Sequence, residues 1–129
     1  MVGLDTGFFV AIMKGDERAV ALWDDLGLRS DPPIVSVLTL GEILYVSYRA
    51  GDPVRGREMV KGIEMACAVK DVDLGIVRKA AGRKQSRSIP YVDSVILATF
   101  LVEGCHEIHT TDPNHFMTVG RKAPRVVPW

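Results

Sequence analysis

Four acidic residues, Asp5, Glu42, Asp93 and Asp112, are the side chains whose type and spacing best fit a chemical site in this sequence. Carboxylate oxygens are the ligands that hard divalent cations such as Mg²⁺ and Mn²⁺ prefer over thiolates. Bound ions of this kind can generate a nucleophile, polarise an acceptor group and stabilise a leaving oxygen. If the fold brings these four acids together, they form a metal site suited to hydrolysis.

The elements that must position the acids alternate along the chain, because apolar runs of strand length are followed by segments of helical period. This alternation predicts an α/β domain with a mainly parallel sheet. The strands are expected at Met1–Leu4, Ile34–Val37, Ala66–Val69, Glu107–Thr110 and Val126–Val127. The helices are expected from Phe8, over Ala19–Leu26, from Leu40 toward Gly51, around Met59–Ala66, from Leu74 and over Tyr91–Glu103.

Three of the acids follow a predicted strand: Asp5 the first strand, Glu42 the second within about a turn, and Asp112 the fourth. The carboxyl ends of parallel strands lie along one edge of a sheet, where ligands bind. Asp93 reaches the same region from the first turn of a helix that is apolar nearly all round and should therefore be buried. We expect the four carboxylates to converge at one sheet edge.

Each acid also has a purely structural explanation. Asp5 and Asp112 could cap the helices that follow them, and Pro113 suits the first position of such a helix. Thr39 and Glu42 have the spacing of a capping box. Asp93 could simply favour the positive end of its helix dipole. Only the spatial arrangement of the side chains decides between capping and a shared site.

Four segments carry a resemblance: VGLDTGFF at the start, SVLTLGEILY at 36–45, YVDSVILATF at 91–100 and HTTDPNHF at 109–116. In order and spacing they resemble the four motifs of PIN domains, over essentially the whole chain, 1–129. In size the chain is most similar to VapC-type toxins and solitary prokaryotic relatives. The resemblance implies a PIN-like fold, a parallel sheet of about five strands flanked by helices. It also implies a metal-dependent endoribonuclease that hydrolyses RNA phosphodiester bonds. The likeness to VapC-type toxins further implies the toxin of a toxin–antitoxin pair, with a cognate antitoxin as partner.

The resemblance also implies roles for particular residues. Asp5, Asp93 and Asp112 would bind one or two Mg²⁺ or Mn²⁺ ions, and Glu42 would bind the second ion or act through a water molecule. The positions that match small polar residues beside the acids are Thr6, Thr39 and Thr110. Many relatives place a further acid just after the fourth one, whereas this chain has Pro113-Asn114-His115, which leaves Asn114 as a weaker ligand. Carboxylates gathered without a metal repel each other, so at least one should have a raised pKa.

Contacts to RNA are expected from basic and aromatic side chains. Lys79, Arg83 and Arg87 recur at i, i+4 on the outer face of the helix whose inner face is predicted to be Leu74, Val77 and Ala81. A second basic patch could comprise Arg49, Arg55, Arg57 and Lys61, and bases could stack on Tyr45, Tyr48 and Tyr91. An ordinary solvated helix face is the competing explanation. The total charge is +0, but residues 1–52 hold eight acids and four bases, and residues 53–129 hold eight acids and twelve bases.

The chain is expected to act as one cytoplasmic domain. Its 129 residues suit a single core, and Cys67 and Cys105, both in apolar surroundings, indicate reduced thiols. The longest apolar run, Val95–Val102, is too short to span a bilayer, so no membrane partner is expected. The apolar side chains of the early helices, Phe8, Phe9, Ile12 and Trp23, predict spare surface, and relatives that resemble this chain imply a homodimer.

Other classes fit the sequence less well. A phosphoacceptor receiver domain would need an acidic pair after the first strand and a lysine after the last long strand, whereas this chain has Asp5-Thr6 and Thr110-Thr111. A catalytically weak PIN-like binding module would keep the acids but act by docking to a partner. A zinc site at Cys105, His106 and His109 matches no common spacing.

Overall fold

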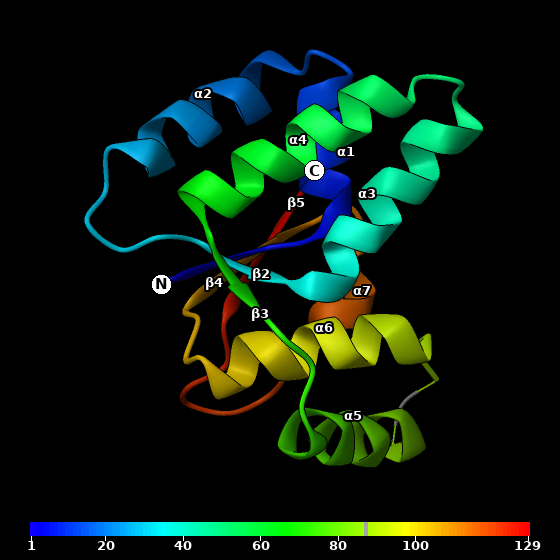
Figure 1. Cartoon of the computed structure of the whole chain (residues 1–129). Coiled ribbons are helices and arrows are strands. Elements are labelled where there is room, and N and C mark those ends of the chain that lie inside the picture. The colour runs from blue at the N-terminus through cyan, green and yellow to red at the C-terminus, as the bar shows by residue number, and fades with distance from the viewer. Residues whose placement is uncertain (87) are drawn as a thin grey trace.

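A computed structural model describes residues 1–86 and 88–129, so the predicted RNA contact Arg87 lies outside the described residues. Figure 1 shows a central sheet with helices on both faces. The strands are β1 (Val2–Leu4), β2 (Ile34–Ser36), β3 (Ala68–Lys70), β4 (Glu107–Thr110) and β5 (Arg125–Pro128). The helices are α1 (Thr6–Met13), α2 (Glu17–Gly27), α3 (Val37–Arg49), α4 (Pro53–Ala66), α5 (Leu74–Ser86), α6 (Tyr91–Val102) and α7 (Pro113–Phe116).

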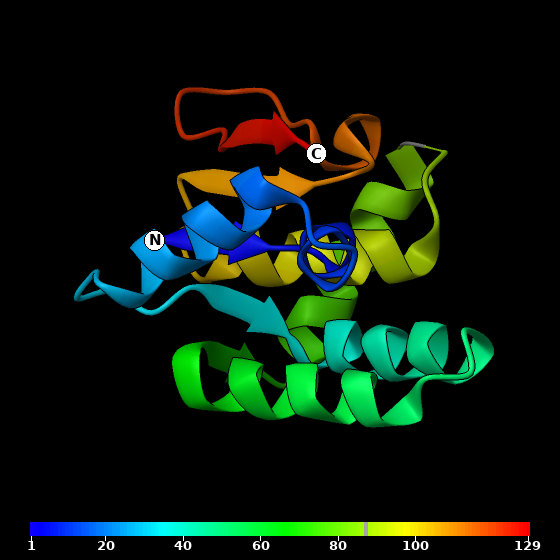
Figure 2. The same cartoon turned by 90° about the horizontal axis from the view of Figure 1, so that it is seen from above.

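The sheet formed by the described residues has the strand order β3-β2-β1-β4-β5, and every pairing is parallel. Figure 2 shows β5, β4, β1 and β2 side by side. The chain builds outward from β1 in one direction to β3 and then returns to place β4 on the other side of β1. Such a reversal of strand order opens a crevice at the carboxyl ends of the two central strands. The predicted α/β fold with a parallel five-stranded sheet is confirmed, and the receiver order 2-1-3-4-5 is excluded.

The two faces of the sheet are covered by different helices because side chains alternate along each strand. Val2, Leu4 and Val35 point into a core with residues of α1, α2, α3 and α4. Ile34 and Ile108 point to the other face and pack against α6 and α7. In Figure 1, α1 to α4 lie above the sheet and α5 and α6 below it.

Helix α6 is buried as predicted, with Ser94 through Phe100 all inaccessible. Its outer side is covered by α5, whose buried residues are Ile76 and Ala80. The predicted inner face of α5 is therefore wrong, because Leu74 is 61% exposed and Ala81 is exposed. Leu74 occupies the first position of the helix, where no other element covers it, and the small Ala80 allows close packing on α6. No helix in the described part of the chain is long and apolar enough to cross a bilayer.

Two predicted boundaries move by a few residues. The second strand ends at Ser36 rather than Val37, because the Ser36 hydroxyl accepts the Leu38 N–H at 3.2 Å and starts α3. The third strand covers Ala68–Lys70 rather than Ala66–Val69, since α4 continues to Ala66.

The apolar side chains of α1 and α2 are in the core, not on the surface as predicted. Phe8 and Phe9 are fully buried, and Phe9 packs edge-on against Trp23 at 5.7 Å between ring centroids. Ile12 and Trp23 are partly buried against the same core. They therefore provide no spare surface for a second copy. Cys67 and Cys105 are both free thiols, as expected.

The close contact between β1 and α6 gives a prediction for Gly3. A Cβ at this position would lie 2.7 Å from Phe100 Cδ1, closer than carbon atoms can approach. We expect Gly3→Ala to lower the free energy of unfolding by roughly 1–3 kcal/mol, since overpacking forces the strand and the ring apart. Gly62→Ala, in α4 with no atom within 4 Å of its Cβ, is the matched control and should raise stability by up to about 1 kcal/mol. Urea denaturation measures both, and equal stability of the two variants would contradict the packing.

Candidate metal centre

Asp5 ends β1 and lies beside the end of β4. Its carboxylate Oδ2 accepts a hydrogen bond from Thr110 Oγ1 at 2.8 Å, and its backbone N–H donates to the His109 carbonyl at 3.0 Å. Asp5 has the backbone position of the N-cap of α1, but its side chain makes no capping hydrogen bond. The carboxylate is only 4% exposed. Capping therefore does not explain why an acid is buried here, whereas a site at the sheet edge does.

Glu42 lies within α3 and faces the start of α1. Thr6 Oγ1 donates to Glu42 Oε1 at 2.6 Å, and the buried Thr39 Oγ1 lies 3.4 Å from the same Thr6 hydroxyl. The capping-box explanation for Glu42 is wrong, because Ser36 is the N-cap of α3 and Glu42 is well inside the helix. Two threonines predicted to flank the acids thus orient Glu42.

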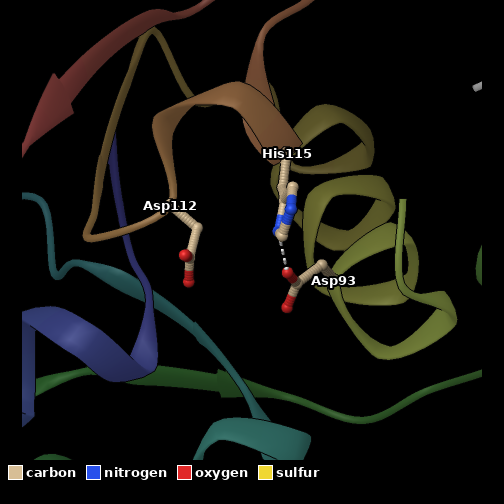
Figure 3. A group of neighbouring side chains, drawn as sticks. All are labelled: Asp93, Asp112 and His115. Atoms are coloured by element: carbon tan, nitrogen blue, oxygen red, sulfur yellow. Dashed lines mark hydrogen bonds and ion pairs between the residues drawn. The ribbon is translucent and has the colours of Figure 1, made fainter. Parts of the chain in front are cut away.

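Asp93 and Asp112 come together from different elements, and His115 contacts Asp93 (Figure 3). One possible ligand atom from each of the three lies within 4.8 Å of the others. His115 Nδ1 is 2.6 Å from Asp93 Oδ2. Asp112 precedes α7 but does not cap it with its side chain, and its backbone N–H donates to Thr110 Oγ1 at 3.0 Å. Thr110 therefore connects Asp5 with the backbone of Asp112.

From the sequence, His115 is a residue near Asp112 that could contact a phosphate or simply lie at the surface, and the structure places it against Asp93. Asp112 and His115 are three residues apart, so on one helical turn they lie on the same side. That spacing was the available signal, and it could be used only once the segment was known to form α7. Asn114, predicted as a supporting residue, is exposed on the same turn.

The charges of the site disfavour its empty, fully ionised form. The pKa of Asp5 is raised to about 6, chiefly by burial and in smaller part by the charges of Asp93 and Glu42, against the lowering effect of its hydrogen bonds. Burial also raises the pKa of Glu42 most, followed by the charges of Asp93 and Asp112. The expected increase in pKa is confirmed, although desolvation contributes more than repulsion. The mutual effects also show that all four acids are close enough to interact.

The donor set fits a divalent cation. Asp93 and Asp112 offer oxygen ligands, which suit Mg²⁺ and Mn²⁺, while Asp5 and Glu42 lie outside the group of side chains within 4.8 Å of one another. His115 can hold Asp93 in one orientation, as residues behind metal ligands commonly do. A cation would remove the repulsion between these carboxylates. No other group of three or more acids, histidines or cysteines among the described residues has comparable spacing.

The other predicted side chains are not members of this group. Lys79 is exposed and Arg83 half-buried, both on the side of α5 that faces the segment after α7. Tyr45, Tyr48 and Tyr91 are all between 46% and 59% exposed, so they are not core residues. The zinc alternative is wrong: His109 is buried, with Nε2 2.6 Å from Glu107 and Nδ1 accepting from Trp129, while His106 is exposed.

Solved structures of similar fold come from toxin–antitoxin complexes. A complex from Klebsiella pneumoniae has 16% identity and a TM-score of 0.75, over 98% of this chain and 96% of that one. A VapBC complex from Rickettsia felis, bound to promoter DNA, has 15% identity and a TM-score of 0.77, over 100% and 99%. A Mycobacterium tuberculosis VapC toxin that cleaves the sarcin–ricin loop has 21% identity and a TM-score of 0.67, over 84% and 87%. At these identities the likeness concerns the fold.

Sequence comparison identifies the family. No curated protein matches the chain by sequence. A family model described as the PIN domain matches residues 2–122, a range that includes all four acids and His115. Because that match covers nearly the whole length, the chain belongs to the PIN domain family.

Proposed function

We propose that this protein is a metal-dependent endoribonuclease that hydrolyses RNA phosphodiester bonds with Mg²⁺ or Mn²⁺. The PIN domain family is a family of nucleases, which supports the hydrolase class. The single observation that carries the metal dependence is the meeting of Asp93, Asp112 and His115 within 4.8 Å, next to the buried Asp5. Gathering carboxylates around the buried Asp5 is unfavourable because their charges repel one another, and a bound cation would remove that repulsion.

Each residue of the site would have a separate role in the reaction. Asp5, Asp93 and Asp112 would hold the ion, with Glu42 binding a second ion or a water molecule. When bound, the metal supplies an activated water and stabilises charge on the phosphate and the leaving oxygen. Thr110 orients the Asp5 carboxylate and Thr6 orients Glu42. His115 holds Asp93 through Nδ1, which would leave the Nε2 side of the ring to contact the substrate.

The biological role proposed is that of a toxin with a cognate antitoxin. Support comes from the similar structures, several of which are toxin–antitoxin complexes. A gene beside this one whose small product copurifies with the chain and inhibits its nuclease activity would support the pairing. RNA is proposed over DNA because one similar toxin is described as cleaving the sarcin–ricin loop.

The alternative is a PIN-like binding module without turnover. It explains the fold equally well but gives no reason for Thr6 and Thr110 to hold two carboxylates in fixed positions. The nuclease assay below separates the two.

We expect Asp93→Asn to reduce RNA hydrolysis by more than about 100-fold, since changes even to residues behind metal ligands cost 10–100-fold. The assay measures cleavage of a labelled RNA with Mg²⁺, with Mn²⁺ and with a chelator. Glu64→Gln, an exposed acid on α4, removes the same charge away from the site and should keep full activity. A fully active Asp93→Asn protein, or parent activity unaffected by the chelator, would refute the proposal.

The raised pKa of Asp5 predicts a particular pH dependence without metal. Its pKa is about 6 in the folded protein against 3.8 when exposed, so the folded state binds more protons between these values. The Asp5 contribution to stability should therefore fall as pH rises from about 4 to 6, by about 3 kcal/mol at roughly 1.4 kcal/mol per pKa unit.

Melting curves of the parent and Asp5→Asn in chelator, at pH 4 to 8, measure this contribution. Asn keeps the acceptor for Thr110 but does not ionise. The stability of the variant should therefore not decrease between pH 4 and 6, and the variant should be more stable than the parent above pH 6. Added Mg²⁺ or Mn²⁺ should raise the melting temperature of the parent above pH 6 and much less in the variant. A variant that melts below the parent at pH 8 without metal would show that Asp5 stabilises the fold instead.

We also propose a symmetric homodimer. The apolar side chains of α1 and α2 expected to form its interface are in the core, so we propose the exposed apolar side chains of α3 and α6 as the interface instead. Tyr45, Val46 and Tyr48 are exposed on α3, and Tyr91 and Val92 on α6. Closed two-fold pairing is the commonest way to cover such surface. Light scattering at micromolar concentration should give twice the 14.2 kDa chain mass, and a monomer mass would contradict the proposal.

A further inference from the structure

A second polar site lies between α5, the end of α6 and the segment that joins α7 to β5. It is a depression of about 410 Å³. Four basic side chains line it, two from α5 and two from the joining segment: Lys79, Arg83, Arg121 and Lys122. None of the described residues that line it is acidic. Residues more than 35 positions apart in the sequence therefore concentrate positive charge at one place, in a chain whose total charge is +0.

The joining segment presents its bases on a turn. The Ala123 N–H donates to the Gly120 carbonyl at 3.2 Å, which leaves Arg121 and Lys122 at the two central positions. Gly120 has a φ of 125°, which favours glycine there. Side chains at the centre of such a turn project from the backbone, and both are exposed. Exposed, projecting cations are suited to contact a ligand rather than to stabilise the core.

The same depression contains a hydroxyl that lacks a partner. Thr118 Oγ1 is buried and makes no hydrogen bond among the described residues. Buried hydroxyl groups are normally hydrogen-bonded, so this oxygen is an unsatisfied polar atom in the wall of the depression. The four cations that line the depression have the chemistry that recognises phosphate oxygens.

The depression is distinct from the metal centre but close to it. Leu101 lines the depression, and Asp93 is in the first turn of the same helix, α6. Eight residues separate them, which is about 12 Å along the axis at 1.5 Å per residue. A strand whose scissile phosphate lies at the acids could therefore place another phosphate, a few nucleotides away, in the depression.

We propose that this basic depression binds the phosphate backbone of the RNA substrate away from the cleaved bond. The inference rests on the proposed ribonuclease function, which it extends by naming where the strand is held. Contacts of this kind set the position and affinity of the strand and carry no sequence information. They affect long substrates and leave the chemistry at the metal centre unchanged.

The test uses the full chain with Lys79→Gln/Lys122→Gln. The matched control is Arg78→Gln/Lys84→Gln, which also removes two positive charges and changes exposed residues of α5 that do not line the depression. Binding of a labelled single-stranded RNA is measured by fluorescence anisotropy in chelator, from about 50 to 200 mM salt. If two phosphate contacts are lost, the slope of log Kd against log salt should flatten by about 1.4, at 0.7 per phosphate. The control should flatten it by less than half of that.

Cleavage with metal separates this site from the proposed activity. The double variant should raise KM for the long RNA while the rate on a dinucleotide equals that of the parent. A parent that cleaves neither substrate refutes the ribonuclease proposal, while the anisotropy result still decides whether the depression binds RNA. Equal salt slopes for the double variant and its control would overturn the inference. It would also be overturned if the parent bound duplex DNA more tightly than RNA and the double variant weakened DNA binding more than RNA binding. Lys122→Gln alone, on the turn, repeats the measurement if α5 is destabilised.

Discussion

The parallel pairing of β1 with β4 is the constraint on which the rest of the site depends. It joins the first strand to one that begins more than 100 residues later, and it places the strand-order reversal beside Asp5. The pairing continues past the strands through the Asp5 N–H to His109 and through Thr110 to the Asp5 carboxylate. Gly7 allows this approach, because a Cβ there would lie 2.1 Å from Thr111 Oγ1. Without this close contact, the acid after β1 and the acid after β4 would not share one crevice.

Hydrogen bonds hold three of the like-charged side chains of the acidic site in fixed orientations. Hydroxyl groups hold Asp5 and Glu42, and an imidazole holds Asp93, while burial raises the pKa of both Asp5 and Glu42. Hydrogen bonds to an ionised carboxylate partly offset its loss of water. A bound cation would offset the rest of the cost of desolvating the carboxylates. The arrangement that lowers the stability of the metal-free protein therefore also favours metal binding.

Helix α6 connects the metal centre to the rest of the molecule. Its first turn supplies Asp93, its buried middle packs between the sheet and α5, and its end borders the basic depression. Because the helix is apolar nearly all round, it cannot shift without exposing core surface, and the distance between the two polar sites is therefore rigid. The exposed tyrosines on α3 and α6 border no part of the core, which leaves them available to a partner or a substrate.

By itself the sequence determined the element order, the buried α6, and the positions of Asp5 after β1 and of Asp112 after β4. Those features follow from local periodicity and from the rule that carboxyl ends of parallel strands meet. Only the tertiary structure decided which side of α5 is buried, that Phe8 and Phe9 are core residues, and that His115 joins Asp93 and Asp112. A helical face shifts by 100° with each residue, so a one-residue difference in α5 changes which side chains are covered. Contacts such as His115 to Asp93 depend on how α7 is seated against α6, and no local pattern encodes the relative position of two elements.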